Sequence, residues 1–433
     1  MTAETTQHIE RKNTVSPWVR RAGPGVAATA MVLYPLAYLH WPNLRLQIDA
    51  MVYRFAGDRL LGGLDLYSVG VTGKPTELLF IYPPFAAICA APLALLQPSS
   101  VQILWLLGVV AALAYVVVRM LKSLGMTPGA GLWSLATLLF GVIAWLEPMR
   151  LTAQLGQINL LLLVLVVADL LGADQAIPEL GNAKQGKWTG VGIGVAAGLK
   201  LTPALFIVYL LLTRRVRAAL VAAATFAATI AVGFAVAPAD SRTYWLAGRF
   251  DDVNRISRDL FANTSVRGLF LRLHWPPTLA AVVAIAIAVV ALAVAAGAYR
   301  RGHAVLAIAI VGMASTAASP FSWSHHWVWF APLVVHLGYR GYVLGSRYCA
   351  AAMWFVGAFA GGWFVSVADH TPQAGILSLR PGGIWNVIMP AAYVFLFAAV
   401  LLCTAAWLSR TRDANRLPGA AAHDLHDVER AHA

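Results

Sequence analysis

The chain has 433 residues, of which 59% are hydrophobic and only 12% charged, with a mean hydropathy of +0.69. Soluble domains carry about 25% charged residues, so this composition excludes a soluble protein and indicates an all-α integral membrane protein. The formal net charge is +13, but the basic residues stand in short runs between apolar segments. Such runs are typical of membrane orientation and contact with anionic lipids, so we expect no nucleic-acid partner.

Apolar segments of a length suited to about a dozen spans follow one another along the chain. They lie near residues 24–41, 78–97, 101–118, 131–147, 155–173, 188–213, 216–237, 278–299, 303–319, 327–345, 350–369 and 386–408. Basic runs belong on the cytoplasmic side, which predicts cytoplasmic tails at 1–23 and 409–433 around a single transmembrane domain at 24–408. The loops 42–77 and 238–277 then face the periplasm. No small-residue cleavage site follows the first apolar run, so we expect no cleaved signal peptide.

Two apolar segments fit poorly as straight spans. Residues 78–97 contain Tyr82-Pro83-Pro84, and residues 188–213 contain the sequence GLKLTP at 198–203. Proline and glycine at these places predict broken or re-entrant helices, which membranes tolerate where protein or a wet cavity surrounds the backbone. Ordinary kinks are the alternative.

The first outer loop contains the stretch IDAMVYRFAGDRLLGGLDLY at residues 48–67. It predicts an amphipathic helix on the membrane surface, with Asp49 as its N-cap and a stop at Gly62-Gly63. Asp49 and Asp58 are nine positions apart and therefore face opposite ways on a helix, so we do not expect them to share a metal ion. Asp58 is the candidate for chemistry, and an ion pair with Arg54 is its structural alternative.

Further polar side chains fall at or near the same outer side. Gln157 and Asn159 stand at the mouth of a span, where amides can also simply join helices. Lys200 is the only charge between Trp188 and Arg214, and an intramembrane cation predicts a functional site with an anionic partner.

The segment 319–329 combines tryptophans typical of an interfacial belt with the adjacent pair His325-His326. Histidine can titrate or bind phosphate near neutral pH, and adjacent residues point in different directions, so we expect one of the two to enter a site. The spacing predicts no metal centre. In the loop 238–277, Arg267 can bind phosphate through its planar fork, although most charges of this loop fit a solvated face.

These features together predict an outward-facing cavity with a carboxylate, cations suited to a phosphate, and amides and aromatics suited to sugars. The sugar-binding candidates are Tyr82, Gln157, Asn159, Asn263 and Trp323. No glycine-rich nucleotide loop follows a strand, so we expect the sugar donor to be linked to a lipid.

Five stretches, namely DAMVYRFAGDRLLGGLDLY, YPPFAAICAAPLALL, GQINLLLLVLVVADL, GLKLTPALF and NTSVRGL, resemble the successive signatures of a known family. This is the GT-C family of actinobacterial glycosyltransferases that depend on polyprenyl-phosphate sugars, and in particular its mycobacterial branch acting on phosphatidylinositol mannosides. The resemblance spans residues 24 to about 408.

The resemblance implies a GT-C fold with about a dozen transmembrane helices in the plasma membrane. It also implies inverting transfer of mannose from polyprenyl-phosphate-mannose to a phosphatidylinositol mannoside, forming an α-(1→2) linkage at the periplasmic face. By the same resemblance, Asp58 is the catalytic aspartate, and we expect it to act as the general base. From the chemistry of the residues, we expect Lys200, His325 or His326, and Arg267 to stabilise the phosphate of the sugar donor. We expect no cofactor and no obligatory metal.

Other readings of the sequence stay open. One is an arabinofuranosyl or lipomannan-branching transferase of the same fold. Another is a lipid or sugar transporter, which the broken helices and Lys200 also fit.

Overall fold

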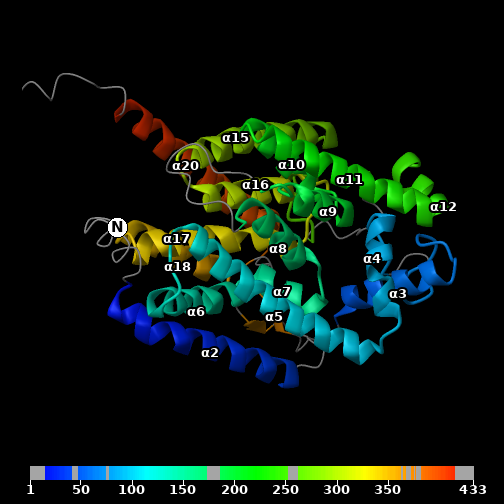
Figure 1. Cartoon of the computed structure of the whole chain (residues 1–433), viewed down its shortest axis with the longest axis horizontal. Coiled ribbons are helices and arrows are strands. Elements are labelled where there is room, and N and C mark those ends of the chain that lie inside the picture. The colour runs from blue at the N-terminus through cyan, green and yellow to red at the C-terminus, as the bar shows by residue number, and fades with distance from the viewer. Residues whose placement is uncertain are drawn as a thin grey trace, which may run out of the picture.

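The part of the chain that the structure describes is almost entirely helical (Figure 1). The computed structural model describes residues 15–40, 47–74, 78–172, 186–251, 262–361, 364–366, 372–374, 376 and 382–414. Most of both predicted tails and part of the second outer loop therefore lie outside the described residues. One short antiparallel hairpin departs from the all-α expectation, with β1 (Phe364–Ser366) paired to β2 (Pro372–Ala374).

The helices follow one another along the chain from α2 to α20. They are α2 Pro17–His40, α3 Ile48–Leu61, α4 Pro84–Ala94, α5 Pro98–Ser123, α6 Ala130–Ala144, α7 Glu147–Leu155, α8 Asn159–Leu170, α9 Val191–Leu199, η2 Thr202–Ala204, α10 Leu205–Leu212, α11 Val216–Val236, α12 Pro238–Ser241, η3 Arg242–Leu246, η4 Arg249–Asp251, α14 Val266–Arg272, α15 Pro277–Arg300, α16 Ala304–Ala318, η5 Ser324–Trp329, α17 Phe330–Tyr342, α18 Arg347–Phe359, α19 Trp385–Ile388, η7 Met389–Ala391 and α20 Ala392–Ala414.

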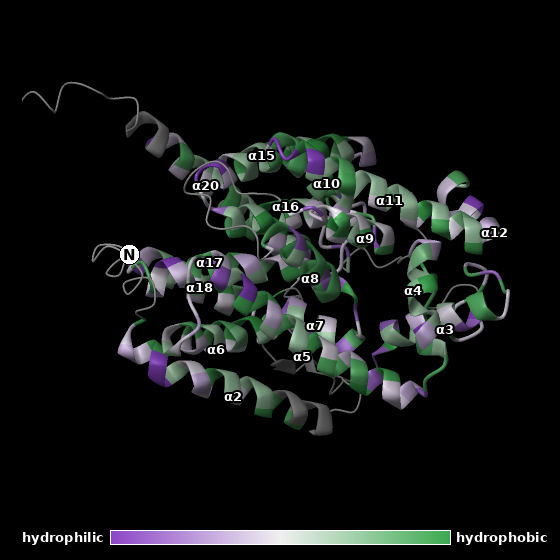
Figure 2. Ribbon diagram, viewed as in Figure 1, coloured by the Kyte–Doolittle hydropathy of each residue, from purple (hydrophilic) through white to green (hydrophobic). Residues whose placement is uncertain are grey.

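Several of these helices have the length and composition of membrane spans. Within the described residues, four long apolar stretches qualify, namely α5, α11, α15 and the segment Trp385–Arg410, and a bent pair formed by α7 and α8 makes a fifth. In Figure 2, hydrophobic residues predominate along the bodies of the helices. The protein is thus a helical membrane protein.

The bend between α7 and α8 has a local cause. The two helix axes meet at 116°, and Gly156 between them has a φ of 72°, a left-handed conformation that costs other residues about 1–2 kcal/mol. Gly156 also lies against the start of α3, because an added Cβ would fall 2.6 Å from the Cβ of Ala50. This glycine therefore turns the chain and lets α3 approach.

The predicted break in residues 188–213 is confirmed. Helix α9 ends at Leu199, Lys200 is extended with φ −155° and ψ 131°, and a 3₁₀ turn with Pro203 leads into α10. Proline lacks an N–H and disfavours helix before it. The break leaves Lys200 at a point where the backbone leaves the helix.

The segment 78–97 also holds a short helix. Helix α4 begins at Pro84, directly after the extended Pro83, and has 11 residues. At 1.5 Å per residue it is about 16 Å long, too short to cross a hydrocarbon core of about 30 Å. The proline pair therefore sets where this helix starts and places Tyr82 just before it.

Helix α3 ends as the sequence predicts, but it begins differently. Gly62 is its C-cap, as predicted, whereas Gln47 is its N-cap and Asp49 lies within the first turn. The prediction that Asp49 caps the helix is wrong, because its carboxylate instead accepts a hydrogen bond from a distant side chain, Gln157.

The loop after α3 and the segment after α11 contact each other. The backbone N–H of Leu66 donates to Oδ1 of Asp240 at 2.9 Å, and the rings of Tyr67 and Tyr244 stack with centroids 5.9 Å apart. The loop after α3 is thereby held against the segment after α11.

Candidate active site

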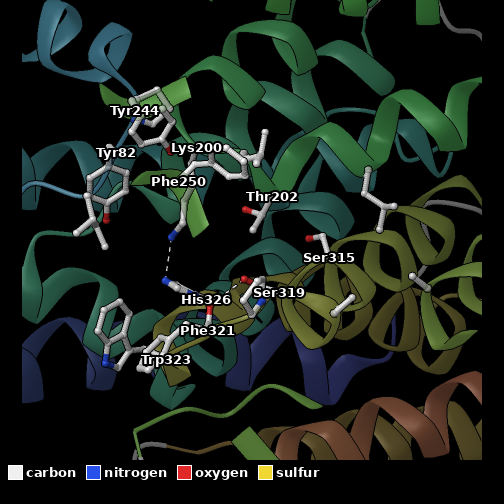
Figure 3. A pocket seen from close by; sticks show the side chains of 17 residues that line it. Tyr82, Lys200, Thr202, Tyr244, Phe250, Ser315, Ser319, Phe321, Trp323 and His326 are labelled. Atoms are coloured by element: carbon white, nitrogen blue, oxygen red, sulfur yellow. Dashed lines mark hydrogen bonds between the residues drawn. The ribbon is translucent and has the colours of Figure 1, made fainter. Parts of the chain in front are cut away.

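A cavity of about 390 Å³ lies where the broken segments converge. Its walls come from the residues before α4, the break between α9 and α10, the segment after α12, the C-terminal end of α16 and the following turn. The polar and aromatic side chains that line it, shown in Figure 3, are Tyr82, Lys200, Thr202, Tyr244, Phe250, Ser315, Ser319, Phe321, Trp323 and His326. The remaining wall is apolar.

Lys200 is the centre of a hydrogen-bonded cluster. Its Nζ donates to Oδ1 of Asn159 at 3.0 Å and lies 2.8 Å from Nε2 of His326, the contact drawn as a dashed line in Figure 3. Nδ2 of Asn159 in turn donates to the backbone carbonyl of His325 at 3.0 Å. The cluster therefore joins the broken segment to α8 and to η5.

The two histidines have different surroundings. Their rings are nearly perpendicular, at 87°, with centroids 4.7 Å apart, and only His326 lines the cavity. With Lys200 as an ammonium ion, Nε2 of His326 accepts, so the ring is neutral and carries its proton on Nδ1. His325 is buried and stacks on Trp323.

A second network ties the cavity wall to α3. The hydroxyl groups of Tyr53 and Tyr82 lie 2.9 Å apart, and both contact Oε1 of Gln157 at 3.2 Å. Nε2 of Gln157 donates to Oδ2 of Asp49 at 2.6 Å. Lys200 lies 5.7 Å from the ring centroid of Tyr82. Asp49 is thus linked to the cavity through Gln157 and Tyr82.

The carboxyl group of Asp49 has the properties of a proton acceptor. Burial raises its pKa to about 6, while the hydrogen bond from Gln157 and the positive charge of Lys200 oppose the shift. Oδ1 accepts no hydrogen bond from any described residue, and the side chain is half-buried. One oxygen is therefore fixed and the other is open to a ligand.

The structure does not bring Asp58 to this cavity. Its side chain is exposed on the opposite face of α3 from Asp49. The alternative ion pair with Arg54 is not formed either, because Arg54 donates to the carbonyls of Leu96 and Ala94 at the end of α4. Asp58 is accordingly a surface residue of α3.

Arg267 and Asn263 lie outside the residues that line the cavity. Asn263 is buried, with Nδ2 donating to the carbonyl of Pro320 and Oδ1 accepting from the backbone N–H of Ser322. It therefore holds the segment that carries Phe321 and Trp323 rather than facing the cavity.

Gln157 and Asn159 join helices and order site residues at the same time. Both are buried, and neither lines the candidate active-site cavity. The sequence reasoning missed Asp49, Tyr244 and Phe250 as site residues. For Asp49 the sequence contained one indication. Tyr53 lies four residues later and therefore on the same helical face, so this face carries two polar groups that can form one site.

This arrangement can hold an anion beside an apolar chain. A cation with a neutral histidine stabilises negative charge in a site sheltered from water, and the apolar wall suits a hydrocarbon. A carboxylate with a pKa near neutrality can take a proton from a hydroxyl. The site therefore fits group transfer from a lipid-linked phosphate.

The comparisons with known proteins agree with this chemistry. The chain is 31% identical to a polyprenol-phosphate-mannose-dependent alpha-(1-2)-phosphatidylinositol mannoside mannosyltransferase of Mycolicibacterium smegmatis, over 91% of the chain and 93% of that relative. It is 32% identical to a polyprenol-phosphate-mannose-dependent alpha-(1-2)-phosphatidylinositol pentamannoside mannosyltransferase of the same organism, over 89% of the chain and 92% of the relative. No solved structure matches significantly. The family model of glycosyltransferase family 87 matches residues 80–320, and the chain belongs to this family.

Proposed function

We propose that this glycosyltransferase transfers mannose from polyprenyl-phosphate-mannose to a phosphatidylinositol mannoside and forms an α-(1→2) linkage. The observation that carries the proposal is the cavity in which Lys200 and His326 face an apolar wall, with the carboxylate of Asp49 linked to it. The names of relatives that align with nine-tenths of the chain support the choice of sugar and acceptor.

Asp49, rather than Asp58, is the general base in this proposal. Its open oxygen takes the proton of the acceptor hydroxyl while that hydroxyl oxygen attacks the anomeric carbon of mannose. Gln157 holds the other oxygen of the carboxylate and so fixes its orientation. Because a β-linked monophosphate gives an α-linked product, the anomeric centre inverts in one displacement.

Lys200 and His326 act on the leaving group. As the bond between the anomeric carbon and the phosphate oxygen breaks, the electron pair stays on the polyprenyl phosphate. The ammonium group of Lys200 and the Nδ1–H of His326 are the donors for that charge. The aromatic side chains of Tyr244, Phe250 and Trp323 at the wall suit a sugar ring and the first isoprene units.

The proposal includes a GT-C architecture with about a dozen membrane crossings and a site on the periplasmic face. Basic residues at one end of the molecule support this orientation. Arg300 donates to the carbonyl of Leu212 at 3.0 Å and Arg301 to that of Leu408 at 2.7 Å, so these basic loops share one side. The cavity adjoins the other end of α16, and positive loops face the cytoplasm.

The decisive experiment is an assay of the purified protein with polyprenyl-phosphate-mannose and phosphatidylinositol mannoside acceptors of increasing length. We expect one mannose to be added, and linkage analysis to give α-(1→2). If transfer occurs only from a polyprenyl-phosphate-arabinose donor, the protein is instead an arabinofuranosyl transferase of the same fold. Movement of lipid across vesicles without a new glycosidic bond would replace it with transport.

A further inference from the structure

A second cavity lies at the other end of α16 from the candidate active site. It has a volume of about 410 Å³ and is walled by α16, α17, α18 and α20. His303, the N-cap of α16, lines it, whereas Ser319, the C-cap, lines the candidate active site. Because α16 has 15 residues at 1.5 Å each, the two cavities are separated by about 20 Å along this helix.

The body of this second cavity is apolar and reaches the lateral surface of the protein. Leu333 and Val356 at its inner side are buried, whereas Phe355 on the outer side is 58% exposed and Cys403 is also exposed. Both exposed residues lie on helices of the membrane domain. A hydrocarbon chain in the surrounding bilayer therefore has direct access to it.

One end of the second cavity holds a cation, Arg340. His303 and His336 line the same end, and no aspartate or glutamate is among the described residues that line the cavity. The two histidine rings meet edge to face with centroids 5.5 Å apart, and as neutral rings each carries one N–H that can donate to an anion beside Arg340. The guanidinium of Arg301 lies 6.0 Å from the ring of Trp407, another lining residue.

His336 carries a polar atom that lacks a partner. The residue is 5% exposed, and its Nδ1 makes no hydrogen bond with any described residue. A buried ring nitrogen without a partner is unfavourable, and such groups in native proteins call for an explanation. His336 therefore carries an unused hydrogen-bonding atom in a residue that lines this cavity.

We propose that the second cavity binds one anionic phospholipid, with its phosphate at Arg340, His303 and His336 and an acyl chain along the apolar wall. The guanidinium fork of arginine matches phosphate geometry, and basic pockets between membrane helices bind anionic head groups. The cation lies at one end of the cavity and the apolar wall forms the rest. A phospholipid has the same division, with its charged head group at one end and its acyl chains at the other. The lipid belongs to the leaflet opposite the candidate active site, and its binding does not depend on which sugar is transferred.

Native mass spectrometry of the full-length protein in detergent, titrated with phosphatidylglycerol or phosphatidylcholine, tests this site. We expect one tightly retained phosphatidylglycerol, at least tenfold preferred over phosphatidylcholine. Arg340→Gln should lower its occupancy at least tenfold, because a charge-assisted hydrogen bond to phosphate is lost. The matched control is Arg347→Gln, which removes an exposed arginine near the same helix end without touching the cavity and should bind as the unmodified protein does.

A second pair of variants tests the hydrocarbon half. Ala352→Trp fills the cavity, whereas Ala351→Trp places the same ring on the exposed neighbouring position that does not line it. Only the first should lose retention. Thermal unfolding and gel filtration verify that each variant folds. If Ala352→Trp does not fold, Arg340→Gln alone tests the proposal.

Three results would overturn the proposal. These are unchanged retention in Arg340→Gln, equal retention of phosphatidylcholine, or displacement of the lipid by millimolar inorganic phosphate, which would show an anion site without a hydrocarbon component. Because retention is measured without a sugar donor, each of these outcomes is independent of whether the protein transfers mannose.

Discussion

Replacing Asp49 by asparagine tests the assignment of the general base. The substitution keeps the size of the side chain, and the amide oxygen can still accept the 2.6 Å hydrogen bond from Gln157. It removes the negative charge of the carboxylate and with it the ability to take a proton from the acceptor hydroxyl. The structure therefore offers a variant in which the chemistry changes and the local packing does not.

The expected loss follows from the contribution of a positioned base. General-base catalysis contributes typically about 10²- to 10⁴-fold, so kcat/KM for mannosyl transfer should fall by that factor. At about 1.36 kcal/mol per tenfold, this is about 2.7–5.4 kcal/mol of transition-state stabilisation. Binding of the sugar donor should change little, because Lys200 and His326 are untouched.

The assay measures mannose transfer from polyprenyl-phosphate-mannose with purified variants of equal thermal stability. Asp58→Asn is the matched control, since it removes an exposed aspartate from the opposite face of the same helix. We expect this control to keep its activity within about twofold. Full activity in Asp49→Asn, or a loss confined to Asp58→Asn, would refute the reasoning and return the role to Asp58.

Further predictions concern the same site. The pKa of Asp49 is raised to about 6, so the base is ionised above that pH. Below it, kcat/KM should fall about tenfold per pH unit, and a profile flat to pH 5 would contradict this. Lys200→Met should lower kcat by about 10²- to 10³-fold through loss of charge on the leaving phosphate, and normal turnover would exclude that role. Gly156→Ala should destabilise the fold by about 1–2 kcal/mol and reduce transfer, because a Cβ there meets Ala50 beside Asp49; thermal unfolding and the transfer assay check both. EDTA should leave transfer unchanged, because Lys200 supplies positive charge at the phosphate, and activity that EDTA abolishes and Mg²⁺ restores would show a metal requirement.

Local features of this fold could be predicted from the sequence. The membrane class follows from composition, and the break at 198–203 follows from a proline that cannot continue a helix and disfavours one before it. The end of α3 at Gly62 also has a local cause, because glycine is the residue that most often ends a helix. Lys200 stood out because a single charge in an apolar run is costly unless it has a function.

The identity of the aspartate at the site depended on tertiary structure. Asp49 and Asp58 lie on opposite faces of one helix, and the sequence of that helix does not say which face meets the rest of the protein. Packing of α3 against α4 and Gly156 turns Asp49 toward Gln157, which is 108 residues away, and leaves Asp58 in solvent.

The sequence also could not show which of the two adjacent histidines, His325 or His326, faces the cavity. Their directions depend on the short 3₁₀ turn of η5 and on Lys200, 126 residues from His326. The sequence by itself determined that this is a membrane protein with broken helices and a set of polar residues able to form a site, because those properties are local. Only the tertiary structure decided which of these residues meet, because each contact joins segments far apart in the chain.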